Sequence, residues 1–285
     1  MHSLDDFRKT YHKAQVPDSL DYRLSQALTG KRRHNMTRTL RTAGLSLAAG
    51  LIVFVGSLNA LPSFAEALVD LPIIGSFVEV VSLNLEVQAH EAQDISIQTP
   101  QVTGLEDQDV QATINQAYVD EAMARYQAYM EEMGDLLEEG AHSAFNSGYI
   151  VETDTDDILS IGQYFVEVAG SSSNEVTYTT LDKVNGLVIT LPSLFKDDTY
   201  LAIISDYLKA TMEDLMAKDD SYSYFIGDPG FTGITEDQDF YISSDHKLVI
   251  AFDKYEVSPG YMGVQTFEIP SHLLQDILVS QQYIQ

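Results

Sequence analysis

The chain opens with two short amphipathic patterns, continues through one long uncharged stretch, and then alternates between strand-like and helix-like periods. No residue between Arg41 and Glu66 carries a charge, and residues 43–65 read AGLSLAAGLIVFVGSLNALPSFA. A helix of this length, rising about 1.5 Å per residue, crosses a hydrocarbon core of roughly 30 Å. The pattern therefore predicts a single transmembrane helix within residues 42–66.

The region that follows, residues 67–285, mixes both periods. Alternating apolar residues predict a strand over 77–89, and helical spacing up to Gly140 predicts a long helix that Asp107 or Asp109 can cap. Further strands are expected at 149–151, 158–168, 175–181, 187–191, 239–243, 248–255 and 264–269, and further helices at 200–216 and 271–279. Asn185-Gly186 is a strong hairpin signal. We expect one α+β domain, an antiparallel sheet faced by helices.

The N-terminal arm, residues 1–41, carries too few large apolar residues for a core of its own. Its apolar positions follow helical spacing in two short segments. The candidate binding residues on these two faces are Phe7, Tyr11, Leu20, Leu24 and Leu28. Such faces are buried against a partner protein or lie on an anionic lipid surface, for which the basic residues 31–33 would serve equally well.

Charge separates the chain into two regimes around the apolar stretch. Of the 16 Lys and Arg residues nine lie in residues 1–41 against four acids, whereas residues 68–285 hold seven basic residues and 38 acids. Because basic residues favour the cytoplasmic side, the N-terminus is expected in the cytoplasm and the acidic region outside the cell membrane. The net charge of −27 argues against direct nucleic-acid binding.

The apolar stretch also has features of a cleavable signal peptide. Ala65-Glu66-Ala67 is a small-x-small sequence, and it follows the basic and apolar segments in the order that signal peptides require. Forty-one preceding residues and 23 apolar ones favour a standing signal anchor. Pro62 ends or bends the helix nearby, so Ala65 and Ala67 are candidate residues of a cleavage site that is used conditionally.

The sequence offers little support for a catalytic site. The chain has no cysteine, and its seven histidines form no HExxH or other ligand spacing. Ser244-Asp245-His246-Lys247 matches S-x-x-K without the accompanying SDN or KTG motifs. The acidic run 154–157 lacks the glycine of a calcium loop. We expect no enzyme activity, no cofactor and no metal.

Four stretches carry a family resemblance. The arm contributes Tyr11, Val16-Pro17 and the segment through residues 31–33, and the outer region begins with LPIIGSFVEV at 71–80. LPSLFK at 191–196 and above all FDKYEVSPGYMG at 252–263, followed by FEIP at 267–270, complete the set. Together they resemble the sigma-V type anti-sigma factors, whose outer region is of the DUF4163/DUF3298 type.

That resemblance implies a function for each part of the chain. The arm is expected to sequester an extracytoplasmic-function sigma factor, and the outer domain to bind lysozyme. Binding would expose the site after Ala67 to signal peptidase, after which an intramembrane protease would free the sigma factor. A cationic lysozyme also suits a strongly acidic domain. The alternative is a cell-wall-binding or accessory membrane protein with no sigma-factor partner.

The turn within FDKYEVSPGYMG is the candidate ligand-binding site. Pro259 and Gly260 favour a fixed turn, and Tyr261 offers a large amphipathic contact. The candidate residues are Ser258, Pro259, Tyr261 and Met262. The alternative is that Tyr255 and Tyr261 simply cover the end of the sheet.

Overall fold

The computed structural model describes residues 78–87, 93–138, 142–169 and 171–285. The arm, the apolar stretch and the triplet Ala65 to Ala67 lie outside these residues, as do the five candidate sigma-binding residues. Within the described part no helix is both long and apolar enough to cross a membrane.

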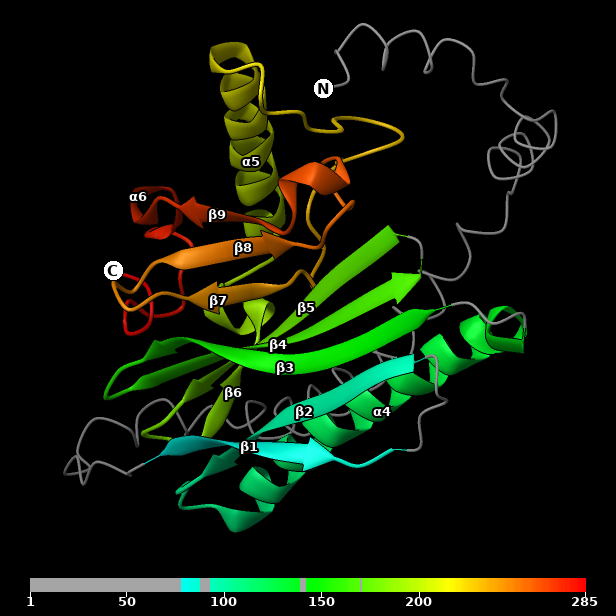
Figure 1. The fold of residues 1–285 in the computed structure, drawn as a ribbon. Coiled ribbons are helices and arrows are strands. Elements are labelled where there is room, and N and C mark those ends of the chain that lie inside the picture. The colour runs from blue at the N-terminus through cyan, green and yellow to red at the C-terminus, as the bar shows by residue number, and fades with distance from the viewer. Residues whose placement is uncertain (1–77, 88–92, 139–141, 170) are drawn as a thin grey trace, which may run out of the picture. The chain divides into compact units, whose positions relative to one another are not determined.

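A six-stranded sheet forms the larger part of the described fold (Figure 1). Its strands are β1 (Glu79–Leu85), β2 (Gln93–Thr103), β3 (Ser143–Asp154), β4 (Ile158–Ala169), β5 (Ser171–Asp182) and β6 (Leu187–Ile189), and they neighbour one another in that order. The turn from β5 to β6 contains Gly186 at a φ of 63°, as the predicted Asn-Gly hairpin requires.

The sheet is mixed rather than wholly antiparallel, which corrects the sequence-based expectation. β2 and β3 run parallel, with Ile95 opposite Phe145. The long helix α4 (Gln108–Glu138) connects them, because parallel neighbours need a crossover of this length. The sequence pattern did not predict β2 at all, since its residues QDISIQTPQVT include many polar side chains and Pro100.

The predicted cap of α4 is confirmed at Asp107. Its Oδ1 atom accepts hydrogen bonds from the backbone N–H groups of Asp109 and Val110, at 2.9 and 3.0 Å. These are two of the donors that the first helical turn leaves without an intrahelical partner. α4 then packs on one face of the large sheet, through Ile114 and Tyr118 at one end and Tyr129 and Met133 towards the other.

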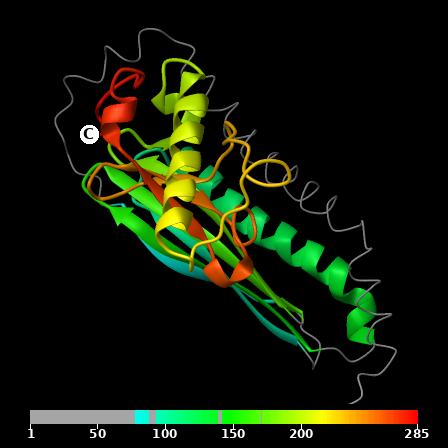
Figure 2. The same ribbon diagram turned by 90° about the horizontal axis from the view of Figure 1, so that it is seen from above.

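A three-stranded antiparallel sheet covers part of the opposite face of the large sheet (Figure 2). It consists of β7 (Phe240–Ile242), β8 (Leu248–Phe252) and β9 (Gln265–Ile269), and α5 (Thr199–Lys218) packs on it. The 3-10 helix η1 (Leu191–Leu194) precedes α5. The closing helix α6 (Ser271–Leu274) is shorter than the 271–279 that the sequence predicts.

The free edge of β7 rests on the face of the large sheet through hydroxyl groups. The carbonyl oxygen of Ile242 accepts hydrogen bonds from Thr153 Oγ1 at 2.6 Å and from Ser160 Oγ at 3.2 Å. Ile158 of β4 joins the apolar core that α5 forms with the small sheet. Polar and apolar contacts together therefore fix the small sheet on the large one.

Candidate functional site

The strands β8 and β9 are joined by residues 253–264, here called the β8–β9 loop. It contains a tight turn, because the N–H of Glu256 donates to the carbonyl of Asp253 at 3.0 Å, and then the 3-10 helix η2 (Gly260–Met262). The N–H of Met262 donates to the carbonyl of Pro259 at 2.9 Å. These bonds give the SPGYM segment a defined backbone path, as the proline and glycine suggested.

Several aromatic side chains are exposed on and beside this loop. Tyr261 is 70% exposed and Tyr255 is 53% exposed, while Tyr222 and Phe225 of the segment before β7 are 38% and 39% exposed. We call these four residues the aromatic surface. Tyr and Phe side chains that are exposed to this extent are typical of binding surfaces, because they offer a large contact area at a low entropic cost.

The two segments of the aromatic surface are bonded to each other. Tyr261 donates its hydroxyl hydrogen to the carbonyl of Ser221 at 3.1 Å, and the N–H of Phe225 donates to the carbonyl of Val257 at 2.8 Å. The N–H of Ser223 also lies 3.3 Å from Met262 Sδ. The surface is therefore held by contacts between segments that are about 40 residues apart in the sequence.

The candidate ligand residues differ in how they are placed. Tyr261 points its large side chain to solvent, and Pro259 and Met262 are half-buried. Ser258 is fully buried, and its Oγ has no hydrogen-bond partner within the described part of the chain. The side chain of Ser258 therefore lies beneath the surface that the loop presents.

Tyr255 adopts an unusual backbone conformation. Its φ is 73°, a left-handed value that a bulky residue adopts only when its surroundings enforce it. Its ring lies against the backbone of Gly260, where an added Cβ would come within 2.2 Å of Tyr255 Cζ. Gly260 lets the Tyr255 ring approach so closely because it carries no Cβ.

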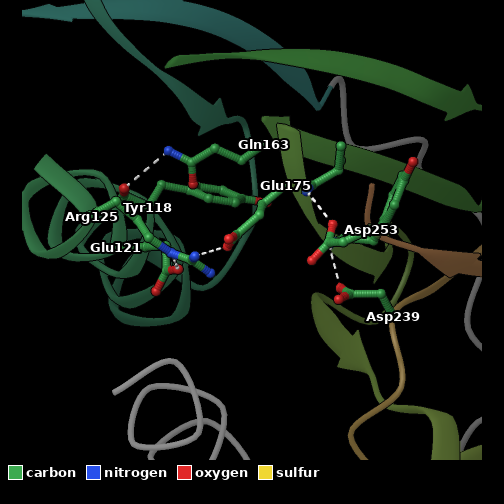
Figure 3. Close-up of polar contacts among 9 residues, drawn as sticks. Tyr118, Glu121, Arg125, Gln163, Glu175, Asp239 and Asp253 are labelled. Atoms are coloured by element: carbon green, nitrogen blue, oxygen red, sulfur yellow. Dashed lines mark hydrogen bonds and ion pairs between the residues drawn. The ribbon is translucent and has the colours of Figure 1, made fainter. Parts of the chain in front are cut away.

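Two aspartates at one end of the small sheet close the outer edge of β5 (Figure 3). Beyond its short pairing with β6, β5 would present unpaired N–H groups at alternate residues. Asp253 Oδ1 accepts from the N–H of Val176 at 2.8 Å, and Asp239 Oδ1 accepts from the N–H of Tyr178 at 3.1 Å. The carboxylates thus take the place that a neighbouring strand would fill.

Asp239 is electrostatically unusual. Loss of hydration raises its pKa well above the ordinary value, and the nearby carboxylate of Asp253 raises it further. The hydrogen bond from Tyr178 and the positive charge of Arg125 act in the opposite direction. No local sequence pattern indicates this pair, because its partners in β5 are 61 and 77 residues away.

A second polar cluster lies on the α4 side of the sheet (Figure 3). Arg125 pairs with Glu121 at 2.8 Å and with Glu175, and its guanidinium lies 5.4 Å from the centre of the Phe165 ring. Gln163 donates to the carbonyl of Tyr118 at 3.2 Å. Each group is held by protein partners, which suits a role in fixing α4 on the sheet.

The other motifs that the sequence singled out have structural contacts. Lys247 of the S-x-x-K match donates to Ser271 Oγ at 3.2 Å and to the carbonyl of Gln285 at 2.6 Å. In the acidic turn, Asp154 pairs with Lys183 at 2.7 Å. Within the described residues, no group of three or more His, Asp or Glu side chains is placed to hold a metal ion.

The aromatic surface lies in a part of the chain that matches a known domain family. Residues 192–272, which include α5, the small sheet and the β8–β9 loop, match the family model "Protein of unknown function (DUF3298)", and residues 36–131 match "Domain of unknown function (DUF4179)". A crystal structure of a DUF3298-family protein from Bacteroides fragilis shares the fold, with a TM-score of 0.54 at 19% identity, over 72% of this chain and 95% of that one.

One curated relative matches over nearly the whole length of the chain. The anti-sigma-V factor RsiV of Bacillus subtilis (strain 168) is 34% identical over 285 residues, which cover 99% of this chain and 98% of the relative. The chain therefore belongs to the RsiV family of anti-sigma factors, as the sequence resemblance indicated. Its members are regulatory proteins, so the expectation that the chain is not an enzyme is confirmed.

Proposed function

We propose that this protein is a membrane-bound anti-sigma factor whose arm sequesters an extracytoplasmic-function sigma factor and whose outer domain is a lysozyme sensor. Lysozyme binding makes the site after Ala67 accessible to signal peptidase, and an intramembrane protease then releases the arm with its sigma factor. Family membership over nearly the whole chain supports the anti-sigma role. The observation that carries the sensing step is the aromatic surface of the outer domain.

Charge supports a cationic ligand for this surface. Residues 68–285 hold 38 acids against seven basic residues. Asp219, Asp220 and Asp228 are exposed in the same segment that contributes Tyr222 and Phe225. Acidic groups around exposed aromatic rings would attract a basic protein and speed its encounter, while the rings would supply the desolvated contact that holds it.

Calorimetric titration of the outer domain with egg-white lysozyme tests the sensing step. Wild type is expected to bind at low and at high salt, with a salt-dependent part that reflects the acidic surface. Tyr261→Ala removes the most exposed ring and is expected to weaken binding by about 2 kcal/mol, roughly thirtyfold. Val184→Ala, which trims another exposed side chain, is the matched control.

The outcomes separate sensing from the alternative function. Equal affinities of Tyr261→Ala and Val184→Ala would place the ligand elsewhere on the domain. If wild type fails to bind lysozyme at any salt concentration, lysozyme is not the signal. The result would then favour the alternative, a cell-wall-binding or accessory protein. Loss of the arm tests the other half, because it should raise transcription from sigma-dependent promoters only in a true anti-sigma factor.

A single charge introduced into the arm tests whether the arm binds the sigma factor. Leu20→Asp would place an unpaired carboxylate on the face that the proposal buries against the sigma factor, so binding should weaken. Ser19→Asp, one residue away and off that apolar face, controls for the added charge. Unchanged affinity of Leu20→Asp in a pull-down with the sigma factor would favour a lipid surface as the partner of the arm.

A further inference from the structure

A series of contacting residues links the aromatic surface to β5 of the large sheet. Lys254 is the central member. Its N–H donates to the carbonyl of Asn174 at 3.3 Å, and its Nζ donates to the carbonyl and to the Oγ of Ser172 at 2.8 and 2.9 Å. Three bonds from one residue thus tie the start of the β8–β9 loop to the edge of β5.

The same lysine also contacts the first ring of the aromatic surface. Lys254 Nζ lies 5.1 Å from the centre of the Tyr255 ring, within the range of a cation–π interaction. Tyr255 in turn holds its left-handed φ of 73° while its ring covers Gly260. A strained conformation of this kind persists only where neighbouring contacts enforce it.

The chain of contacts ends at the candidate ligand residues. Gly260 is the first residue of η2, which also contains Tyr261 and Met262. From Ser172 through Lys254, Tyr255 and Gly260, each member packs on or bonds to the next. We propose that Lys254 is a positioning residue, which fixes the loop against β5 and so presents Tyr261 to the ligand in its bound orientation.

If Lys254 contacted the ligand directly, removing its charge would change the binding affinity in the opposite direction. The ligand proposed above is cationic, so a lysine at the interface would repel it, and removing that charge would strengthen binding. A positioning role predicts weaker binding, because a loop that must be ordered on association costs affinity. The direction of the change therefore distinguishes the two roles. This inference rests on the proposed lysozyme-binding function.

Lys247 provides a matched control within the same strand pair. It stands at the other end of β8 and, like Lys254, donates its Nζ to a serine Oγ and to a backbone carbonyl. Lys247→Met and Lys254→Met remove the same charge and comparable bonds. Only the second change reaches the β8–β9 loop.

The experiment measures binding of egg-white lysozyme to the full-length chain in detergent by surface plasmon resonance. Lys254→Met is expected to weaken binding about tenfold through faster dissociation, and Lys254→Arg to restore it to within about threefold, because a guanidinium can again donate to Ser172. Lys247→Met should bind like wild type. Hydrogen exchange should rise in Lys254→Met at residues 255–262 and stay unchanged in β4.

A double-mutant cycle decides whether Lys254 acts through Tyr261. In the Tyr261→Ala background, Lys254→Met should cost less than about twofold, since the side chain that it positions is absent. Full additivity, or an affinity of Lys254→Met equal to that of Lys247→Met, would overturn the proposal. If wild type itself fails to bind lysozyme, the proposed function fails, which is a different result from binding that is insensitive to Lys254.

Discussion

At the scale of single residues, two aspartates take the place of a missing strand beside β5. Asp239 and Asp253 accept from consecutive outward N–H groups of β5, and one of the two carries a strongly raised pKa. A carboxyl group with a raised pKa in the folded state binds its proton more tightly there than in the unfolded chain. Its ionisation therefore works against folding.

This predicts a specific pH dependence of stability. The free energy of unfolding should fall as the pH rises from about 4, the ordinary aspartate value, through the higher folded pKa of Asp239. Asp239→Asn keeps an oxygen that can accept from Tyr178 but cannot ionise. Its stability should therefore depend less on pH, by about 1.4 kcal/mol for each unit by which the folded pKa is raised.

Urea unfolding of wild type and Asp239→Asn at several pH values between about 4 and 8 measures this difference. Repulsion among the many surface carboxylates contributes equally to both proteins and cancels in the comparison. Glu256 and Arg125 also act on Asp239 and are present in both. Parallel curves for the two proteins would show that Asp239 is ionised at the same pH whether the chain is folded or not.

At the scale of elements, the accuracy of the sequence-based prediction depended on how local each signal was. The helices around 108–138 and 199–218 were predicted from spacing within single segments, and the hairpin at Gly186 from a dipeptide. β2 was missed because its polar residues and Pro100 weaken the strand pattern. Its parallel pairing with β3 depends on α4 as a crossover, which no local period reveals.

The candidate site shows the same contrast between features with a local sequence signal and features that depend on distant contacts. A family resemblance pointed to the loop around Tyr261, and the exposed ring lies there. The sequence offered no signal that Ser258 is buried beneath the loop or that Lys254 bonds to Ser172, 82 residues earlier. Side-chain contacts between distant strands depend on the packing of the two sheets, so they become visible only in the folded structure.

The cap of α4 gives a prediction at this scale. Asp107→Ala removes the acceptor of two N–H groups and should destabilise the domain by about 1 kcal/mol. Asp109→Ala is the matched control, because it removes a carboxylate of the same first turn that interacts mainly with the helix dipole. Thermal unfolding of both variants checks this, and equal losses would mean that charge rather than capping stabilises the helix start.

At the scale of the whole molecule, the proposed signal must travel from the ligand surface to a cleavage site near the membrane. β1, the first strand that the structure describes, begins at Glu79, 12 residues after Ala67. Even fully extended, such a segment reaches only about 40 Å. The length of this segment limits how far the proposed site can lie from β1, so we expect a bound protein ligand to alter the access of a protease to it.

Replacing Ala67 separates ligand binding from release. Signal peptidase accepts small side chains at such sites, so Ala67→Trp should abolish the first cut while Ala67→Ser preserves it. Both changes lie outside the aromatic surface, so both proteins should bind lysozyme like wild type. Immunoblots after lysozyme addition, with a sigma-dependent reporter in the same cells, should show full-length chain and a silent reporter only for Ala67→Trp. Ligand-dependent cleavage that persists in Ala67→Trp would place the site elsewhere in the chain.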